Sequence, residues 1–194
     1  MNTAVDQLHD QWPKSHRINV DEYYRMAEVG LLAPDARVEL IEGEVIDMAP
    51  IGTRHAYVVD QLAAILMRAA DRRALVRIQS PVRLSKRSEP QPDLSLLKLQ
   101  PHRYRDAHPT PADVLLLIEV SDTTLKFDRG PKLAMYAKHG IPEVWVVDIE
   151  NKQLHCMRDP VNEDHHSVVS LQAPQNVAVA AFPDIQIELA ALFD

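Results

Sequence analysis

Two carboxylates and one lysine are spaced in a way that could support metal-assisted chemistry. Asp93 follows two prolines and precedes the short apolar run 94–97, whereas Glu119 interrupts an apolar run that begins at Val114. If the two runs form neighbouring strands, these carboxylates lie close together and repel each other unless a cation separates them. Hard divalent cations such as Mg²⁺ are held by one or two carboxylates together with water and substrate phosphate. The pair therefore predicts a divalent-metal site.

The lysine is Lys132, in a helical segment that follows Glu119. Asp128, Lys132 and Tyr136 occur at four-residue steps, so on a helix they share one face, and Lys132 can project back toward the strand that carries Glu119. An ammonium group beside a metal would stabilise a phosphorane-like transition state or orient the attacking water.

Each of these residues also has an ordinary structural interpretation. Asp93 can be a turn residue after Pro92, Glu119 a strand-end residue and Lys132 an exposed helix lysine. The combination is more specific than its parts, because a charge inside an apolar strand is costly unless something pairs with it. Both interpretations stay open on spacing alone.

The elements that would position these groups form a strand, a helix and a strand within residues 113–148. Apolar residues 114–118 and 144–147 predict two buried strands. Between them, Ser121 and Asp122 are good cap residues for a helix that Gly140 ends. We expect the two strands to be parallel, joined by a right-handed crossover.

Upstream, Asn19 and Glu22 have the spacing of a capping box and predict a short helix that stops at Gly30. Residues 37–50 predict two short strands around the turn dipeptide Glu42-Gly43, with Glu39 in the first strand. Thr53 is expected to cap a longer helix that carries His55 in its first turn.

Further strands are expected elsewhere in the chain. Residues 76–84 alternate between apolar and polar types, which predicts a strand bent at Pro81. Residues 153–157 and 168–171 predict a hairpin across an exposed polar loop. The tail 182–193 is expected to close the domain.

Length and composition favour one globular domain. The chain has 194 residues, of which 46% are apolar and 25% charged, and we expect a domain over residues 19–194 after a loose lead-in, 1–18, from which Trp12 could dock on the core. Cys156, the single cysteine, is expected in the core and fits a reducing compartment. We find no secretion signal or membrane span, so we expect a cytoplasmic protein.

The net charge of −7 argues against a protein that coats nucleic acid. Positive charge is nevertheless concentrated in residues 68–87, which contain seven Arg and Lys residues against one Asp. A solvated surface explains such a run in most proteins. The alternative is a surface for nucleic-acid phosphates that includes Arg72, Arg73 and Arg77.

Three segments also carry a family resemblance: RVELIEGEVIDMAPIGTRHA, QPDLSLL and LLIEVSDTTLKFDRGPKLAMYAKHGIPEVWVVD. In order and spacing they resemble the Uma-two family of the restriction-endonuclease-like PD-(D/E)xK superfamily. The resemblance implies an α/β fold with a central mixed sheet flanked by helices. It matches Asp93 and Glu119 to the acidic positions. Ser121 occupies the position where the wider superfamily has its lysine. In this family a lysine on the following helix is implied to replace it, and Lys132 matches that helix lysine.

The resemblance also implies roles for residues near these three. Glu39 matches an upstream acidic residue that would complete the metal shell, although Glu42 is an alternative for that position. His55 matches a recurrent histidine at a helix start. His55 is therefore expected as an auxiliary residue, and so is Tyr136, which lies one four-residue step beyond Lys132 on the same helix face. Glu39 could equally be an outward strand residue, and His55 a capping or packed histidine.

Together these observations predict an endonuclease that hydrolyses DNA phosphodiester bonds with Mg²⁺ or Mn²⁺. Its partner would be DNA, and a homodimer would suit cleavage of both strands. The alternative is a catalytically inactive scaffold that kept the fold and binds protein or nucleic acid through its surface. Metal-dependent cleavage separates the two hypotheses.

Overall fold

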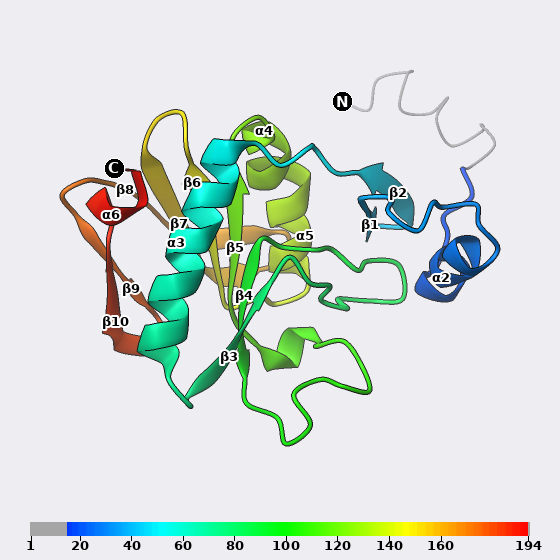
Figure 1. Ribbon diagram of the computed structural model, residues 1–194, viewed down its shortest axis with the longest axis horizontal. Helices are drawn as coiled ribbons and strands as arrows, with labels where there is room; N and C mark the ends of the chain where they lie inside the picture. The colour runs from blue at the N-terminus through cyan, green and yellow to red at the C-terminus, as the bar shows by residue number, and fades with distance from the viewer. Residues whose placement is uncertain (1–14, 194) are drawn as a thin grey trace, which may run out of the picture.

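The computed structural model describes residues 15–193, so Trp12 and most of the predicted lead-in lie outside the described part. A six-stranded mixed sheet in the order β3-β4-β5-β6-β7-β8 forms its centre (Figure 1). The strands are β3 (Ala74–Ile78), β4 (Leu94–Lys98), β5 (Val114–Ser121), β6 (Glu143–Asp148), β7 (Gln153–Val161) and β8 (Asp164–Gln172). The β5–β6 pair is parallel and the other pairs in this sheet are antiparallel.

The connection from β5 to β6 contains α4 (Leu125–Phe127), the wider helical turn η2 (Asp128–Lys132) and α5 (Leu133–Lys138). The predicted strand, helix and parallel strand are thus confirmed, but the helix begins later than expected. Ser121 ends β5, and Thr124 precedes α4. Gly130 has non-helical backbone angles and Pro131 lacks an N–H donor, so the crossover is kinked between α4 and α5.

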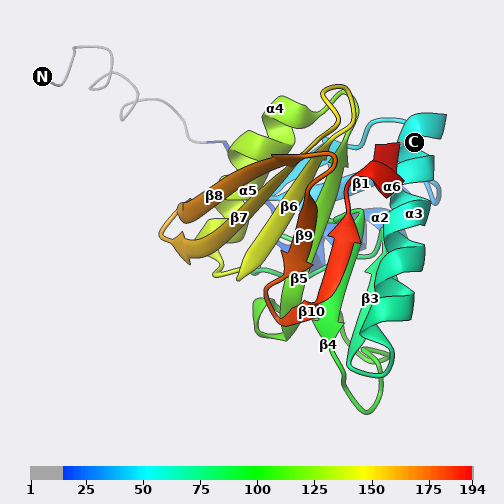
Figure 2. The ribbon, with the colours of Figure 1, turned by 90° about the vertical axis from the view of Figure 1, so that its left-hand side faces the viewer.

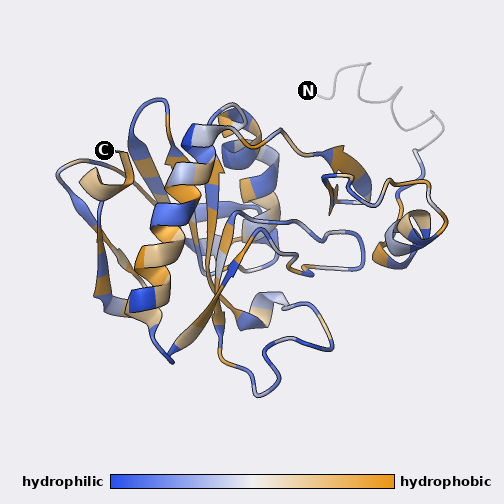
Figure 3. Ribbon diagram, viewed as in Figure 1, coloured by the Kyte–Doolittle hydropathy of each residue, from blue (hydrophilic) through white to orange (hydrophobic). Residues whose placement is uncertain are grey.

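Helices cover both faces of the sheet (Figure 2). On one face lie α3 (Thr53–Ala70), α6 (Ala190–Phe193) and a hairpin of β9 (Asn176–Val179) and β10 (Phe182–Glu188), whereas α5 covers the other face. Successive strand residues point to opposite faces. Ile118 and Val120 of β5 therefore join the core under α3, and Leu117 joins the core under α5. Glu119 follows the alternation and points to the α5 side. Figure 3 shows the hydrophobic residues gathered along these central strands.

A smaller unit of α2 (Val20–Glu28), β1 (Val38–Ile41) and β2 (Glu44–Asp47) lies to one side of the sheet (Figure 1). The predicted capping box of α2 and the β1–β2 hairpin are both present. At the hairpin turn Glu42 has a φ of 47° and Gly43 a φ of 82°, and a Cβ on Gly43 would lie 2.7 Å from Arg17 Cβ. Glycine therefore suits this turn. Glu89 N donates to Leu40 O and joins β1 to the loop 79–93.

Three further expectations about element boundaries were wrong. Gly52, not Thr53, is the N-cap of α3, and no side chain caps that helix. Val82 and Leu84 are buried but lie in a loop, because Val82 N bonds to Pro90 O and Leu84 N bonds to Ser88 O instead of extending β3. The residues expected to form an exposed loop between β7 and β8 extend both strands, so the hairpin turn is much shorter than predicted.

Cys156 is buried, as expected. Within residues 15–193, we find no helix with the length and apolar character needed to cross a membrane.

Candidate active site

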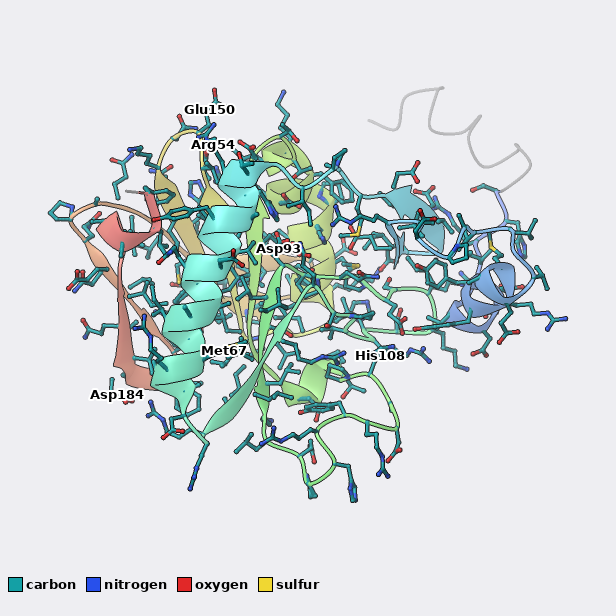
Figure 4. All side chains as sticks on the ribbon, in the orientation of Figure 1. Arg54, Met67, Asp93, His108, Glu150 and Asp184 are labelled. Carbon is teal, nitrogen blue, oxygen red and sulfur yellow. The ribbon has the colours of Figure 1, made fainter. Side chains whose placement is uncertain are left out.

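An open pocket of about 480 Å³ lies where β1, the loop before β4, the end of β5 and η2 meet. Among residues 15–193, the fixed positive charges on its lining are Arg37 and Lys132. Figure 4 labels Asp93 beside α3. Six carboxylates line the pocket: Glu39, Asp47, Asp93, Glu119, Asp122 and Asp128. A pocket so rich in carboxylate oxygens favours hard cations.

Asp93 is held by three hydrogen bonds. Its Oδ2 accepts from Val120 N at 2.8 Å and lies 3.1 Å from His55 Nε2, and its Oδ1 accepts from Gln79 Nε2 at 3.2 Å. Leu94 pairs with Ile118 in the sheet, so Asp93 stands just beyond that pair and its carboxylate takes the N–H of Val120. Burial raises the pKa of Asp93, but the bonds from His55, Val120 and Gln79 outweigh burial and hold the pKa below its ordinary value. Asp93 is therefore ionised at neutral pH.

Glu119 has the opposite behaviour. Burial raises its pKa to about 8, and the charges of Asp128, Asp93 and Glu39 act in the same direction against the opposing charge of Lys132. Its Oε1 accepts a hydrogen bond of 2.5 Å from Tyr136 Oη. The environments of Asp93 and Glu119 thus push their pKa values apart, so the pair can coexist with a single negative charge.

Lys132 lies between two of the carboxylates. Its Nζ is 3.1 Å from Glu119 Oε1 and 3.2 Å from Glu39 Oε2, and only 5% of its side chain is exposed. Burial lowers the pKa of Lys132, but Glu119, Glu39 and Asp128 outweigh burial and raise the pKa above its ordinary value. Lys132 is therefore a buried ammonium, not an exposed helix lysine. The expected reach toward Glu119 is present despite the kink after α4.

The two upstream glutamates separate clearly. Glu39 is buried in β1, lines the pocket and accepts from Gln91 N at 3.0 Å, so it is not an outward residue. Glu42 does not line the pocket, and it pairs with Lys138 at 3.2 Å. Within residues 15–193, no three His, Cys, Asp or Glu side chains form a ready-made metal-binding group. Lys132 bridges Glu39 and Glu119 instead.

The structure therefore brings together Asp93, Glu119, Lys132, Glu39 and His55 on one pocket. His55 is in the first turn of α3, as expected, but its side chain contacts Asp93 and does not cap the helix. The auxiliary residue Tyr136 contacts Glu119 from the buried side. Whether any of these residues acts in catalysis stays a prediction.

Sequence reasoning did not include several lining residues among the site residues. Asp128 accepts from Ser121 Oγ at 2.7 Å and from Thr124 Oγ1 at 2.5 Å, and its four-residue spacing from Lys132 is a signal that could have identified it. Arg37 and Asp122 also line the pocket. Both lie in loops, where we find no periodicity that predicts their direction.

Of the three basic residues, Arg72 and Arg73 follow the C-terminal end of α3, whereas Arg77 lies in β3 and pairs with Ser95, two residues from Asp93. This helix has 18 residues and is therefore about 27 Å long. Arg73 Nη1 is 2.8 Å from Asp184 Oδ2, and its guanidinium lies 4.8 Å from the centre of the Phe182 ring. None of the three arginines lines the acidic pocket. A nucleic-acid surface there stays a prediction, separate from the pocket.

Comparison with known proteins identifies the family. The Uma2 family, described as "Putative restriction endonuclease", matches residues 20–190. The chain belongs to this family. The resemblance stated from the sequence is thereby confirmed for this Uma2 member. A search of curated proteins found no match.

A solved structure supports the fold of this Uma2 member. It is a crystal structure from Anabaena variabilis ATCC 29413, described as "a putative nuclease belonging to DUF820". The TM-score is 0.73 at 17% sequence identity, over 91% of this chain and 97% of that chain. At this identity the likeness shows a shared fold. The expected mixed α/β fold, with a central sheet flanked by helices, is confirmed.

Proposed function

We propose that this chain is an endonuclease that hydrolyses DNA phosphodiester bonds in the acidic pocket with a divalent cation. Asp93 and Glu119, together with Glu39, would hold Mg²⁺ or Mn²⁺. When bound, the cation would supply Lewis-acid stabilisation of the phosphate and a more acidic bound water. The family description and the shared nuclease fold support this assignment.

One observation carries the proposal: a buried Glu119 with a pKa of about 8 lies near an ionised Asp93 in an open pocket. A buried carboxyl group of this kind destabilises the folded protein at neutral pH, and such perturbed groups cluster at functional sites. A divalent cation would compensate the charge of both groups. The oxygen donors of the pocket suit Mg²⁺ or Mn²⁺ because both are hard cations.

The surrounding residues hold the two carboxylates in defined orientations. Val120 N, Gln79 and His55 fix Asp93, and Tyr136 fixes one oxygen of Glu119. Outer partners of this kind orient metal-binding carboxylates and tune their affinity. We therefore assign His55 and Tyr136 positioning roles in the proposed reaction.

Lys132 would act on the phosphate. Its ammonium stays charged in a buried setting, where electrostatic stabilisation is stronger than in water. A substrate phosphate that entered the pocket could compete with Glu39 and Glu119 for its three N–H donors. Lys132 would then stabilise the negative charge that develops during attack by water.

The test is cleavage of plasmid and oligonucleotide DNA by the purified protein with Mg²⁺, with Mn²⁺ and with EDTA. We expect cleavage with either metal ion, none with EDTA, and none for Asp93→Asn or Glu119→Gln. Arg25→Ala is a control because Arg25 is exposed on α2, outside the basic stretch 68–87, and does not line the pocket. It should cleave like the wild type.

Two results would contradict this proposal. One is undiminished cleavage in excess EDTA. The other is no cleavage of single-stranded, duplex or branched DNA with any divalent ion, which would favour the catalytically inactive scaffold. In that case Lys132 and its two glutamates would be a structural ion-pair network.

A further inference from the structure

A second pocket of about 320 Å³ lies near the N-terminal end of α3. Thr53, Arg54, Tyr57 and Val58 of that helix form one side of it. Ile149 and Lys152, in the turn between β6 and β7, together with Leu192 and Phe193 of α6, form the rest. Three separate parts of the fold thus build this pocket.

The lining combines a flat aromatic group, apolar walls and two cations. Tyr57 is 44% exposed, so its ring is accessible to a ligand. The buried residues Val58, Ile149 and Leu192 form its apolar base, and Arg54 and Lys152 supply positive charge. An aromatic ring with apolar walls accepts a planar base by stacking, and neighbouring cations accept the phosphates attached to it. The chemistry suits one nucleotide of a nucleic-acid strand.

Arg54 connects this pocket with the acidic pocket. Its Nη2 donates to Ile149 O at 3.2 Å, on the wall of the second pocket, and its Nη1 is 3.6 Å from Asp122 Oδ1, on the wall of the acidic pocket. Along α3, Gly52 and His55 line the acidic pocket, whereas Thr53 and Arg54 line the second one. The two pockets are therefore neighbours with a shared wall.

We infer that the second pocket is a nucleobase subsite, formed around Tyr57, that selects strands with an unstacked base next to the cleaved phosphodiester. The inference rests on the proposed function and adds the substrate class to it. Bases in a duplex are paired and stacked on their neighbours, so extruding one costs free energy that a single strand does not pay. The subsite therefore favours single-stranded DNA over duplex DNA.

Binding measurements test this without relying on turnover. The full chain is titrated into a fluorescein-labelled single strand and into a hairpin duplex of the same sequence, and fluorescence anisotropy is recorded. Ca²⁺ replaces Mg²⁺, and a gel checks that the DNA stays intact. We expect tighter binding of the single strand. Tyr57→Ala should weaken single-strand binding by about tenfold, because base stacking on an aromatic ring contributes an effect of this order. Duplex binding should change by less than about twofold.

Two substitutions serve as controls. Tyr57→Phe keeps the ring and should bind like the wild type. Met67→Ala also removes a large exposed side chain from α3, but Met67 lies toward the other end of the helix from Arg54 (Figure 4). It should leave binding unchanged.

Lys152→Ala should weaken binding and reduce the salt dependence by about one counterion.

A modified oligonucleotide locates the base. Each strand of a series lacks one base, at a different position in each strand. At one position, loss of the base should weaken binding by the wild type about tenfold. The same strand should bind Tyr57→Ala as tightly as the complete strand does.

One outcome refutes the subsite while the nuclease proposal survives. In it, the wild type binds or cleaves DNA, Tyr57→Ala binds the single strand as tightly as the wild type does, and the wild type binds every abasic strand as tightly as the complete strand. Preference of the wild type for the duplex also refutes the subsite. If the wild type neither binds nor cleaves any DNA, the proposed function fails, and the subsite fails with it.

Discussion

Glu119→Gln should make the metal-free protein more stable at alkaline pH while it abolishes cleavage. The substitution keeps the size of the side chain and an oxygen that can accept from Tyr136, but it removes the ionisable group. Because the substitution keeps the shape of the side chain but not its charge, it separates the destabilisation caused by a buried carboxylate from the destabilisation caused by lost packing.

The magnitude follows from the pKa of Glu119, which is about 8 in the folded protein against an ordinary value of 4.5. Between these values the folded protein keeps a proton that the unfolded chain has lost, so the free energy of unfolding falls as pH rises and levels off above about pH 8. Each pH unit contributes about 1.4 kcal/mol. From about pH 5 to about pH 8, the wild type should lose about 4 kcal/mol relative to Glu119→Gln.

Urea denaturation of both proteins in EDTA across this pH range measures the difference directly. The subtraction cancels the titration of groups that the two proteins share. Adding Mg²⁺ should then stabilise the wild type and have little effect on Glu119→Gln. A stability difference between the two proteins that does not change with pH would refute the raised pKa of Glu119.

Substitutions at three further residues have distinct expected results. Lys132→Met should lower the single-turnover cleavage rate by about 10² or more and destabilise the metal-free protein. Lys132→Arg should restore little of the cleavage rate. A wild-type cleavage rate for Lys132→Met would contradict the role of Lys132. His55→Gln should lower the free energy of unfolding by about 1 kcal/mol near pH 6 and by less at alkaline pH, measured by urea denaturation. The hydrogen bond to Asp93 raises the pKa of His55, so the stability that the charged imidazole contributes is lost as the pH rises through that pKa. Arg158→Met leaves the fully buried Glu143 without its cation and should cost about 3 kcal/mol, measured by urea denaturation, without changing the cleavage rate per folded molecule.

The local signals in the sequence were sufficient to predict much of the fold. Asn19 and Glu22 form the expected capping box, and the turn at Glu42-Gly43 forms the expected hairpin, because both signals depend only on neighbouring residues. The apolar runs on either side of the crossover predicted a parallel pair in the same way. The rest of the fold depends on hydrogen bonds between backbone groups that are not adjacent in the sequence. Val82 and Leu84 have a strand-like pattern, but their N–H groups bond within the loop 79–93.

The candidate site was predictable where a residue broke its local pattern. Glu119 within an apolar strand and Asp93 after two prolines are unusual, and both line the pocket. The sequence could not predict that Lys132 would be buried between Glu39 and Glu119, since that arrangement requires β1 to lie opposite η2. It also could not predict the second pocket, whose walls come from three distant segments. The cytoplasmic location, the homodimer and the single-domain boundary stay predictions.

Anomalous diffraction from crystals soaked in Mn²⁺ tests the central claim most directly, because Mn²⁺ substitutes for Mg²⁺ and gives an element-specific signal. We predict a peak in contact with carboxylate oxygens of both Asp93 and Glu119, and no peak there in Glu119→Gln crystals soaked in the same way. Saturating Mn²⁺ that binds only elsewhere, with Lys132 still paired to Glu119 and Glu39, would contradict the metal site.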